Sequence, residues 1–552
     1  MKHLHLVLVL CLIFPVLIGA ENLRLDIMFT NDVHGGIDRS KATFMNPEFP
    51  PQLGGGASAA TLIKHVRSLA SKTRDHMLFD AGDFFQGRPV GTVTNGVAVV
   101  EYMNAIGYDG LTLGNHEFDI HSDELIETLR LADFPIISCN IIDKRTGEIP
   151  WFLYPYYIYD RMGVRIAVVG YTTSDTKLMS FPDNIRNYDF LVDKEVLQHW
   201  VDVVRIEEKA DVVIVLGHAG LPYDIESGYL SRYDAKGTPL FEERNAVWGY
   251  DAQELAREVS GIDLFIGGHI HKGIPKPWID PYSHTMVIQG YANGTNLGWM
   301  TLLIDPETRT VCGYETPAMR EGIMLTLFED QFIPDPEISA TIEAQVAIAE
   351  QGMDEIVGHS AVYLSRVNVD AQSLMGNTIT DAMRHEVKAD FAFLNLGGVR
   401  SDIKSGPVTY RNIFEVMPFD NMLVSFRCTG EFLRRIIETR VEGGRHGLVV
   451  SGVNVIYSKK RPNFDRVTSL KIGGELLDKN KIYTCVTTDF LLQGNAGLTL
   501  LTQVPEEDII RHETNLRDAI VNYFRKNSPI KTKIDDRWQR KDGAQPTAEM
   551  LQ

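Results

Sequence analysis

Short apolar segments alternate with amphipathic stretches from residue 23 to residue 304, which is typical of a layered α/β domain. A glycine-rich turn at 53–58 opens a stretch in which Leu62, Val66 and Leu69 recur at helical spacing, so we expect a helix there. The segments of predicted strand character are 23–29, 77–79, 136–137, 165–169, 212–216, 264–266 and 286–288. This alternation predicts a domain built around sheets.

A second segment of the same kind follows a connector that contains prolines. Pro334 and Pro336 interrupt the chain, and Ile338, Ile342 and Val346 then recur at the spacing of a helix. These features predict a first domain at 21–322, a connector with a helix at 323–355, a second α/β domain at 356–538 and a polar tail at 539–552.

The first twenty residues form a separate unit. Lys2 precedes an apolar run at 6–18, and the small residues Gly19 and Ala20 follow it, so we expect a secretory signal peptide at 1–20, cleaved after Ala20. An uncleaved membrane anchor is the alternative, although the run is shorter than a bilayer span. Of the five cysteines, Cys11 lies in this unit, and the others are too few for a disulfide framework. The sequence therefore predicts a secreted or periplasmic protein without a membrane anchor.

The composition is that of an ordinary globular chain, with 44% hydrophobic and 23% charged residues among 552. Lysine and arginine total 54 against 73 acidic residues, so the formal net charge is −19. No basic block interrupts this acidic balance, which argues against a nucleic-acid partner and against binding to an anionic membrane. An anionic substrate therefore needs local cations or metal ions. The pattern indicates no particular oligomeric state.

Five polar clusters each follow a short apolar segment of the first domain. They are Asn31-Asp32-Val33-His34, Ala81-Gly82-Asp83, Gly114-Asn115-His116-Glu117-Phe118-Asp119, Gly217-His218-Ala219 and Gly268-His269-Ile270-His271. In open α/β folds, ligands bind at the carboxyl ends of the strands, so we expect these loops to converge on one site. One such cluster by itself is more often a turn or a helix cap, but five in one domain favour a functional site.

The residue types in these clusters suit divalent metal ions. Carboxylate and amide oxygens together with imidazole nitrogens are ligands of Zn, Mn or Fe. Two ions about 3.5–4 Å apart need a bridging carboxylate, and Asp83 fits because it follows a tight glycine turn. Asp32 and His34 are two positions apart and are expected to point the same way from an extended loop. The same expectation holds for His269 and His271.

The order of these clusters resembles that of the calcineurin-like metallophosphoesterases. The second domain resembles that of the secreted 5′-nucleotidase family, which includes bacterial periplasmic UDP-sugar hydrolase/5′-nucleotidase and animal ecto-5′-nucleotidase. The motifs that carry this second resemblance are Met375-Gly376-Asn377, Asn395-Leu396-Gly397-Gly398-Val399-Arg400, Met417-Pro418-Phe419-Asp420-Asn421 and Asp489-Phe490. The resemblance covers about residues 23–535. It implies a two-domain α/β fold, with an N-terminal metallophosphoesterase β-sandwich flanked by helices and a C-terminal α/β domain that binds substrate.

The resemblance also implies two divalent ions, zinc, manganese or another first-row transition metal, bridged by Asp83. The implied ligands of one ion are Asp32, His34, Asp83 and His271, and those of the other are Asp83, Asn115, His218 and His269. Some relatives have Gln or Asn where this chain has His271, so the chain departs toward a stronger nitrogen ligand. His116 and Asp119 match the catalytic pair of the family, in which the carboxylate orients the imidazole.

The second domain contributes the residues that the resemblance assigns to substrate binding, which are Asn395, Gly398, Arg400, Phe419, Asn421 and Phe490. Phe419 and Phe490 match two aromatic residues that hold the nucleobase between them. Arg400 matches a substrate-binding arginine, and a guanidinium suits phosphate because it offers paired donors and a permanent charge.

Two positions depart from the family. Relatives usually have one or two arginines shortly before Gly376-Asn377, where the nearest arginine of this chain is Arg366. Ala496 stands where relatives often have an aspartate that binds ribose. Because of these departures, the sequence defines the leaving group of the substrate less well than it defines the type of reaction.

The function implied is that of a secreted dimetal phosphohydrolase. It removes phosphate from nucleoside 5′-monophosphates by attack of metal-activated water, with nucleotide sugars and nucleoside di- or triphosphates as further candidate substrates. One alternative keeps the dimetal core but acts on a phosphodiester, a non-nucleotide phosphoester or a sulfur ester. Another is a secreted binding protein without catalysis, which is disfavoured because each predicted metal ligand is present.

Overall fold

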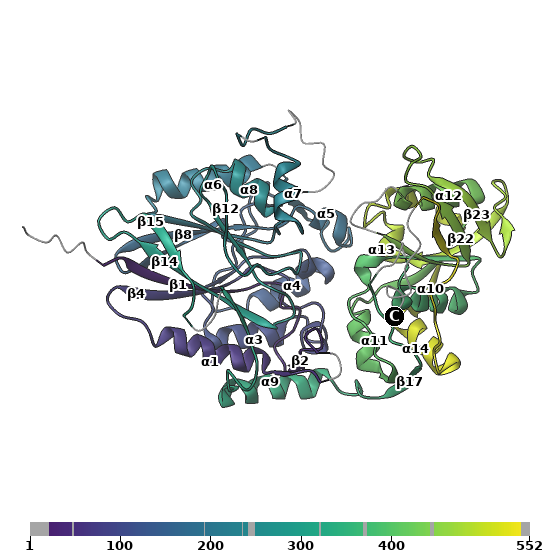
Figure 1. Cartoon of the computed structure of the whole chain (residues 1–552), viewed down its shortest axis with the longest axis horizontal. Coiled ribbons are helices and arrows are strands. Elements are labelled where there is room, and N and C mark those ends of the chain that lie inside the picture. Colours follow the sequence, from purple (N-terminus) through teal and green to yellow (C-terminus); the bar gives the residue numbers. More distant parts are fainter. Residues whose placement is uncertain are drawn as a thin grey trace, which may run out of the picture.

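Two six-stranded sheets pack face to face in the first lobe of the computed structural model (Figure 1). The structure describes residues 21–46, 49–192, 194–234, 236–240, 249–318, 322–367, 372–441 and 447–542. The first sheet has the order β15 (Val311–Glu315), β14 (Asn296–Ile304), β1 (Leu23–Thr30), β4 (Arg74–Asp80) and β5 (Gly110–Leu111), and β16 (Met324–Thr326) pairs with β14. The second has the order β12 (Trp278–Ile279), β13 (Met286–Gln289), β11 (Leu264–Gly267), β10 (Val212–Gly217), β8 (Val164–Tyr171) and β7 (Tyr156–Arg161). The predicted β-sandwich is confirmed.

Helices cover both outer faces of this sandwich. Strand side chains alternate between the sandwich interior and the helices, as the two-residue period of a strand requires. In β1, Ile27 and Phe29 lie in the interior, whereas Met28 packs under the helices. The first sheet is covered by α1 (Gly55–Arg67), α3 (Val97–Ile106), α4 (Ser122–Leu129) and α9 (Pro336–Ala349), and the second by α6 (Lys194–Asp202) and α8 (Ala252–Glu258).

Parallel pairing gathers the carboxyl ends of the strands at one edge. β4 pairs in parallel with β1 and with β5, and β10 pairs in parallel with β8 and with β11. The five polar clusters of the sequence follow β1, β4, β5, β10 and β11. They therefore leave the sandwich in the same direction, which is the placement that the sequence predicted.

Two expectations need correction. Residues 136–137 are not a strand but form isolated bridges, Ile136 to Leu111 and Ile137 to Tyr154. Pro135 immediately precedes them and has no N–H to donate, so a ladder cannot continue there. The predicted connecting helix exists as α9, but its buried side chains Ile338 and Ile342 belong to the first lobe's core. The crossing between lobes is thus the short segment after α9 (Figure 1).

The second lobe encloses one further hydrophobic core. Its larger sheet has the order β21 (Leu448–Ser451), β18 (Phe391–Asn395), β25 (Ile482–Thr488), β20 (Met422–Thr429) and β26 (Ile509–Asn515). A smaller sheet has the order β24 (Glu475–Leu476), β23 (Val467–Ile472), β22 (Val453–Tyr457) and β27 (Trp538–Arg540), and β17 (Ile356–Ser360) pairs with β19 (Gly406–Thr409). The main helices are α10 (Leu374–Val387), α11 (Tyr410–Val416), α12 (Gly430–Val441) and α14 (Leu516–Asn527).

Shorter elements complete the two lobes: β2 (Ser40–Lys41), β3 (Gln52–Leu53), α2 (Pro89–Thr92), β6 (Ile141–Asp143), α5 (Thr176–Met179), β9 (Tyr188–Phe190), α7 (Ile225–Leu230) and α13 (Asp489–Leu492). The predicted signal peptide at 1–20 lies outside the described residues, as does the polar tail from residue 543 onward. None of the helices in the described ranges combines the length and the apolar character that a membrane span requires.

Candidate active site

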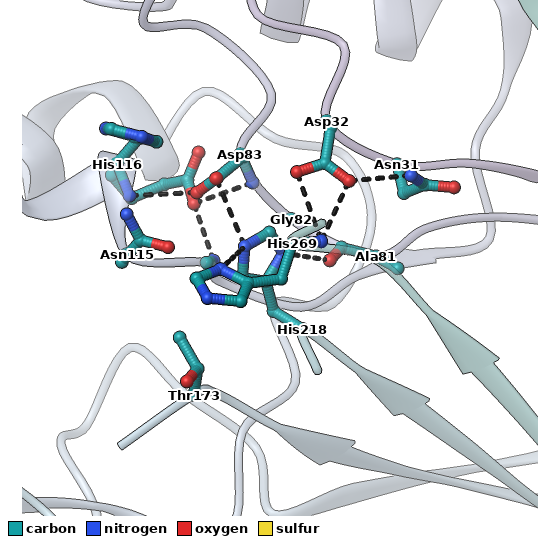
Figure 2. A network of polar contacts seen from close by, with 12 residues as sticks. Asn31, Asp32, Ala81, Gly82, Asp83, Asn115, His116, Thr173, His218 and His269 are labelled. Carbon is teal, nitrogen blue, oxygen red and sulfur yellow. Dashed lines mark hydrogen bonds and ion pairs between the residues drawn. The ribbon is translucent and has the colours of Figure 1, made fainter. Parts of the chain in front are cut away.

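Ligand-type side chains from different loops meet at the carboxyl edge of the sandwich. One group consists of Asp32, His34, Asp83 and His271, and another of Asp83, His218 and His269. Within each group the candidate ligand atoms lie within 4.8 Å of one another. Figure 2 shows Asp83 between His116 and Asp32, with the rings of His218 and His269 below it. Asp83 is common to both groups, which is the position that a bridging carboxylate occupies.

The distances in these groups match the ligand shell of a small divalent ion. Nε2 of His218 lies 3.1 Å from Oδ2 of Asp83. Nε2 of His271 lies 3.3 Å from Oδ1 of Asp32 and 3.0 Å from Nε2 of His34. Ligands bound at about 2.0–2.2 Å to one ion lie about 3 Å from each other. The side chains present therefore fit the metals that the resemblance implies.

Backbone carbonyls orient two of the imidazoles. The Nδ1 atom of His34 donates to the carbonyl oxygen of Gln86 at 2.6 Å, and Nδ1 of His218 donates to that of Ala81 at 2.7 Å. With Nδ1 donating to a carbonyl oxygen, Nε2 is the ring nitrogen that can bind a metal ion in each case. Both Nε2 atoms face the candidate carboxylate ligands, which is the orientation that metal binding requires.

The electrostatic environment of the histidines also suits cations. Burial and the neighbouring His271 hold the pKa of His34 well below its usual range, and burial together with His218 lowers the pKa of His269 to about 3. Both rings are therefore neutral, as metal ligands must be. For His218, burial lowers the pKa, but the adjacent Asp83 carboxylate outweighs it and raises the pKa to about 10. An ion that binds there must displace this proton.

Asn115 fits the oxygen ligand that the resemblance assigns to it. Its Oδ1 atom is buried and has no hydrogen-bond donor among the described residues. A buried carbonyl oxygen without a donor is unusual in folded proteins, and a cation is one partner that satisfies it.

The backbone of the ligand loops differs from the expectation. The loops are not extended, because five of the ligand residues adopt the left-handed conformation with positive φ: Asp32 (48°), His34 (50°), Asp83 (58°), His269 (78°) and His271 (57°). This conformation is uncommon outside glycine and is typical of functional sites. Tight left-handed turns, rather than the alternation of a strand, thus bring Asp32 and His34 together.

His116 and Asp119 form the predicted pair. Both lie in the 3-10 turn η1 (His116–Asp119), and Nδ1 of His116 lies 2.5 Å from Oδ2 of Asp119. Burial lowers the pKa of His116, but the charges of Asp119 and Asp83 outweigh burial and raise it above its usual value. The imidazole is therefore favoured as a cation, with Nε2 left free to act on a substrate.

Glu117 is a positioning residue to which the sequence analysis gave no role. Its fully buried carboxylate accepts hydrogen bonds from the backbone N–H groups of Asp83 (3.0 Å), Phe84 (2.8 Å) and Gly114 (2.6 Å). Burial raises its pKa to about 8, and the backbone donors act in the opposite direction. The carboxylate thus joins the Asp83 loop to the His116 loop. An acidic residue between His116 and the apolar Phe118 was the available sequence signal.

A cavity of about 210 Å³ lies between the two lobes, next to these groups. The second lobe contributes all six residues predicted for substrate binding: Asn395, Gly398, Arg400, Phe419, Asn421 and Phe490. The first lobe contributes His116 and Asp119, together with Gln86, Thr92, Asn95, Ile120, Met179 and Phe181, which the sequence analysis did not identify. The cavity is therefore built from both domains.

Arg400 links this cavity to the metal-ligand groups. Its Nη2 atom lies 3.3 Å from Nε2 of His34, and its guanidinium carbon lies 5.9 Å from the centre of the Phe419 ring. Burial lowers the pKa of Arg400, and the charge of Asp83 opposes that shift. The positively charged guanidinium of Arg400 thus lies between the candidate metal ligand His34 and the aromatic ring of Phe419.

The two departures from the family have defined places. Nη1 of Arg366 donates to the carbonyl oxygen of Arg400 at 2.9 Å, so Arg366 helps to hold the backbone of Arg400 in place. Ala496 lines the cavity. Its N–H donates to the carbonyl oxygen of Leu178 at 3.1 Å, and its carbonyl oxygen accepts from Arg440 at 2.6 Å.

Comparison with known proteins matches both lobes. Residues 25–273 match the calcineurin-like phosphoesterase family, and residues 356–503 match the 5′-nucleotidase C-terminal domain family. A 5′-nucleotidase of Rattus norvegicus is 28% identical over 588 aligned residues, which cover 96% of this chain and 93% of the relative.

Two solved structures share the fold. A 5′-nucleotidase precursor of Thermus thermophilus has a TM-score of 0.79 at 24% identity, covering 95% of this chain and 100% of its own. The sulfate thiohydrolase SoxB of Thermus thermophilus has a TM-score of 0.74 at 18% identity, covering 94% of this chain and 97% of its own. The two-lobe arrangement therefore occurs in proteins whose names indicate different substrates.

Proposed function

Because the chain belongs to the 5′-nucleotidase family and is a metal-dependent phosphoester hydrolase, we propose that it removes phosphate from nucleoside 5′-monophosphates with the aid of two divalent ions. The cavity between the lobes is the observation that carries this proposal. It is lined by the polar and charged groups of His116, Asp119 and Arg400 and by the aromatic rings of Phe419 and Phe490. A ligand with a phosphate at one end and an aromatic base at the other is complementary to this arrangement.

Asp83 is the residue that both ions would share, with Asp32, His34 and His271 on one side and Asn115, His218 and His269 on the other. When bound, such ions polarise the phosphoryl oxygens and make water nucleophilic at neutral pH.

The remaining groups act on the phosphate and the leaving group. Arg400 binds the phosphoryl oxygens, since its guanidinium offers paired donors and a permanent charge. As a cation, the form that the charges of Asp119 and Asp83 favour by raising its pKa, His116 stabilises negative charge that develops on the leaving oxygen. Asp119 holds the imidazole in the required orientation through Nδ1. Glu117 holds the loops of Asp83 and His116 in a fixed position relative to each other.

Phe419 and Phe490 bind the base by stacking. Each base presents a π-face, so stacking contributes about 1–3 kcal/mol without demanding one particular base. Asn395 and Asn421, both more than nine-tenths buried, offer amide groups beside these rings. The candidate metal ligands lie in the first lobe, and the residues beside the base lie in the second. This arrangement supports an enzyme whose first lobe performs the chemistry and whose second lobe selects the substrate.

A substrate panel tests the proposal. The purified protein, loaded with manganese or zinc, is assayed for hydrolysis of adenosine 5′-monophosphate, a UDP-sugar, a phosphodiester, glycerol 2-phosphate and a sulfur ester. We expect the nucleoside monophosphate to have the highest kcat/KM. A higher value for the phosphodiester, for the sulfur ester or for glycerol 2-phosphate assigns the same site to the corresponding alternative substrate and contradicts the proposal.

The export of the protein is a further part of the proposal. It rests on the pattern of the first twenty residues, a positive start followed by an apolar run and small residues at 19 and 20. Intact-mass measurement of the protein expressed with this segment tests it. The expected product begins at Glu21 and is found outside the cytoplasm, whereas an uncleaved chain contradicts the prediction.

A further inference from the structure

We propose that Phe181 and Met179 of the first lobe form the second half of the leaving-group pocket and select phosphoesters whose leaving group carries a planar ring. The inference rests on the proposed function and extends it, because it places a specificity determinant in the domain that performs the chemistry. It also names the class of leaving group, an alcohol that carries a planar base, whether purine or pyrimidine.

The first observation is the enclosure of one cavity by aromatic and apolar groups from both lobes. Met179 ends α5, and Phe181 follows it; both line the cavity that Phe419 and Phe490 line from the other side. The ring of Phe181 meets that of Phe490 edge to face, with centroids 5.5 Å apart and planes at 76°. This geometry is favourable for aromatic pairs and lies across the boundary between the lobes.

The second observation is that the segment around Phe181 is hydrogen-bonded to the turn that contains His116 and Asp119. Oγ of Ser180 donates to the carbonyl oxygen of Asn115 at 3.4 Å. Nδ2 of Asn184 donates to the carbonyl oxygens of Phe118 at 3.1 Å and Asp119 at 3.0 Å. Phe181 lies between these two anchors, so its ring has a set position relative to His116. Removing the ring leaves both anchors in place.

The third observation is the docking of the second lobe on α5. The N–H of Ala496 donates to the carbonyl oxygen of Leu178 at 3.1 Å, and Nη2 of Arg440 donates to the carbonyl oxygen of Ala496 at 2.6 Å. Both backbone polar groups of Ala496 are therefore used, and its side chain has none. Met179, Phe181 and Ala496 therefore offer a ligand apolar and ring contacts rather than side-chain hydrogen bonds, so these three residues distinguish planar rings from aliphatic groups but not one base from another.

Kinetics of Phe181→Ala on two substrates test this inference. Adenosine 5′-monophosphate has a ring in its leaving group, and glycerol 2-phosphate has none. We expect kcat/KM to fall about 2- to 12-fold on the nucleotide, the range for loss of one aromatic pair, and to stay unchanged on glycerol 2-phosphate. Phe181→Leu, which keeps an apolar side chain without the ring, should show most of the same loss. Lys177→Ala is the matched control, because Lys177 lies on α5 just before Phe181, is exposed and does not line the cavity.

A double-mutant cycle with Phe490→Ala examines whether the rings act together. If they enclose one ligand, the double variant should lose less than the product of the two single losses. Multiplicative losses, an equal loss on both substrates, or an unchanged nucleotide rate in Phe181→Ala each overturn the inference while leaving the nucleotidase proposal intact. A wild-type protein without preference for the nucleotide over glycerol 2-phosphate overturns both.

Discussion

The imidazole of His116 lies nearly parallel to the ring of Phe419, with centroids 5.7 Å apart and planes at 23°. His116 comes from the first lobe and Phe419 from the second, so a residue of the proposed catalytic turn contacts a residue of the proposed leaving-group site. Nε2 of Gln86 adds a hydrogen bond to the carbonyl oxygen of Pro418 at 3.1 Å across the same boundary. The two lobes are thus in contact in this structure, and the residues proposed for catalysis and for substrate binding line one cavity.

Asp83→Asn should remove nearly all turnover while leaving the fold intact. The substitution takes a negative charge from the carboxylate that both ligand groups share, so both ions lose affinity. Metal content by elemental analysis and phosphate release measure the loss, and circular dichroism monitors the fold. Metal content equal to that of the wild type together with unchanged activity contradicts the assignment.

His116→Ala should lower kcat by about 10²–10⁴-fold with little change in KM, the range for a positioned proton donor. The pH profile gives a second measure. A cationic imidazole is present below its pKa and is lost above it, so kcat should fall on the alkaline side. Asp119→Asn removes the first charge that raises the pKa of His116, so this alkaline limb should move to lower pH. A limb that stays in place shows that His116 is not the titrating group.

Phe419→Ala and Phe490→Ala should each cost about 1–3 kcal/mol in kcat/KM on adenosine 5′-monophosphate, the usual contribution of one base–aromatic stack. Glycerol 2-phosphate should be hydrolysed at nearly the wild-type rate, because it has no ring to stack on either phenylalanine. Steady-state kinetics on both substrates give the comparison. Equal losses on the two substrates show that the rings act in core packing instead.

Glu117→Gln should destabilise the protein by about 1–3 kcal/mol. The amide keeps one acceptor oxygen and turns an NH₂ group toward backbone donors that now face the carboxylate, so a buried N–H loses its partner. Urea denaturation measures the change, and Glu124→Gln, on the exposed surface of α4, is the control. A stability equal to that of the control contradicts a positioning role.

The sequence was sufficient to predict where the metal-type ligands gather, because each follows a short apolar strand and parallel strands end at a common edge. It did not predict how the loops turn: a positive φ is uncommon for any residue other than glycine, even though aspartate and histidine adopt it more often than most, and the residue pattern gave no signal for it at Asp32 and His34. Phe181 and Met179 gave no signal because their role depends on the other lobe. An aromatic residue after a short helix is indistinguishable in sequence from a core residue, and only the closure of the lobes brings Phe181 against Phe490.

Stepwise addition of manganese to the metal-free protein, with release of phosphate from adenosine 5′-monophosphate as the readout, decides whether the protein is a two-ion nucleotidase. We expect no hydrolysis without metal, a rise to full activity at two ions per chain, and loss of that activity on chelation. Full hydrolysis by the metal-free protein, saturation at a single ion, or a metal-loaded enzyme that leaves the nucleotide intact would contradict it.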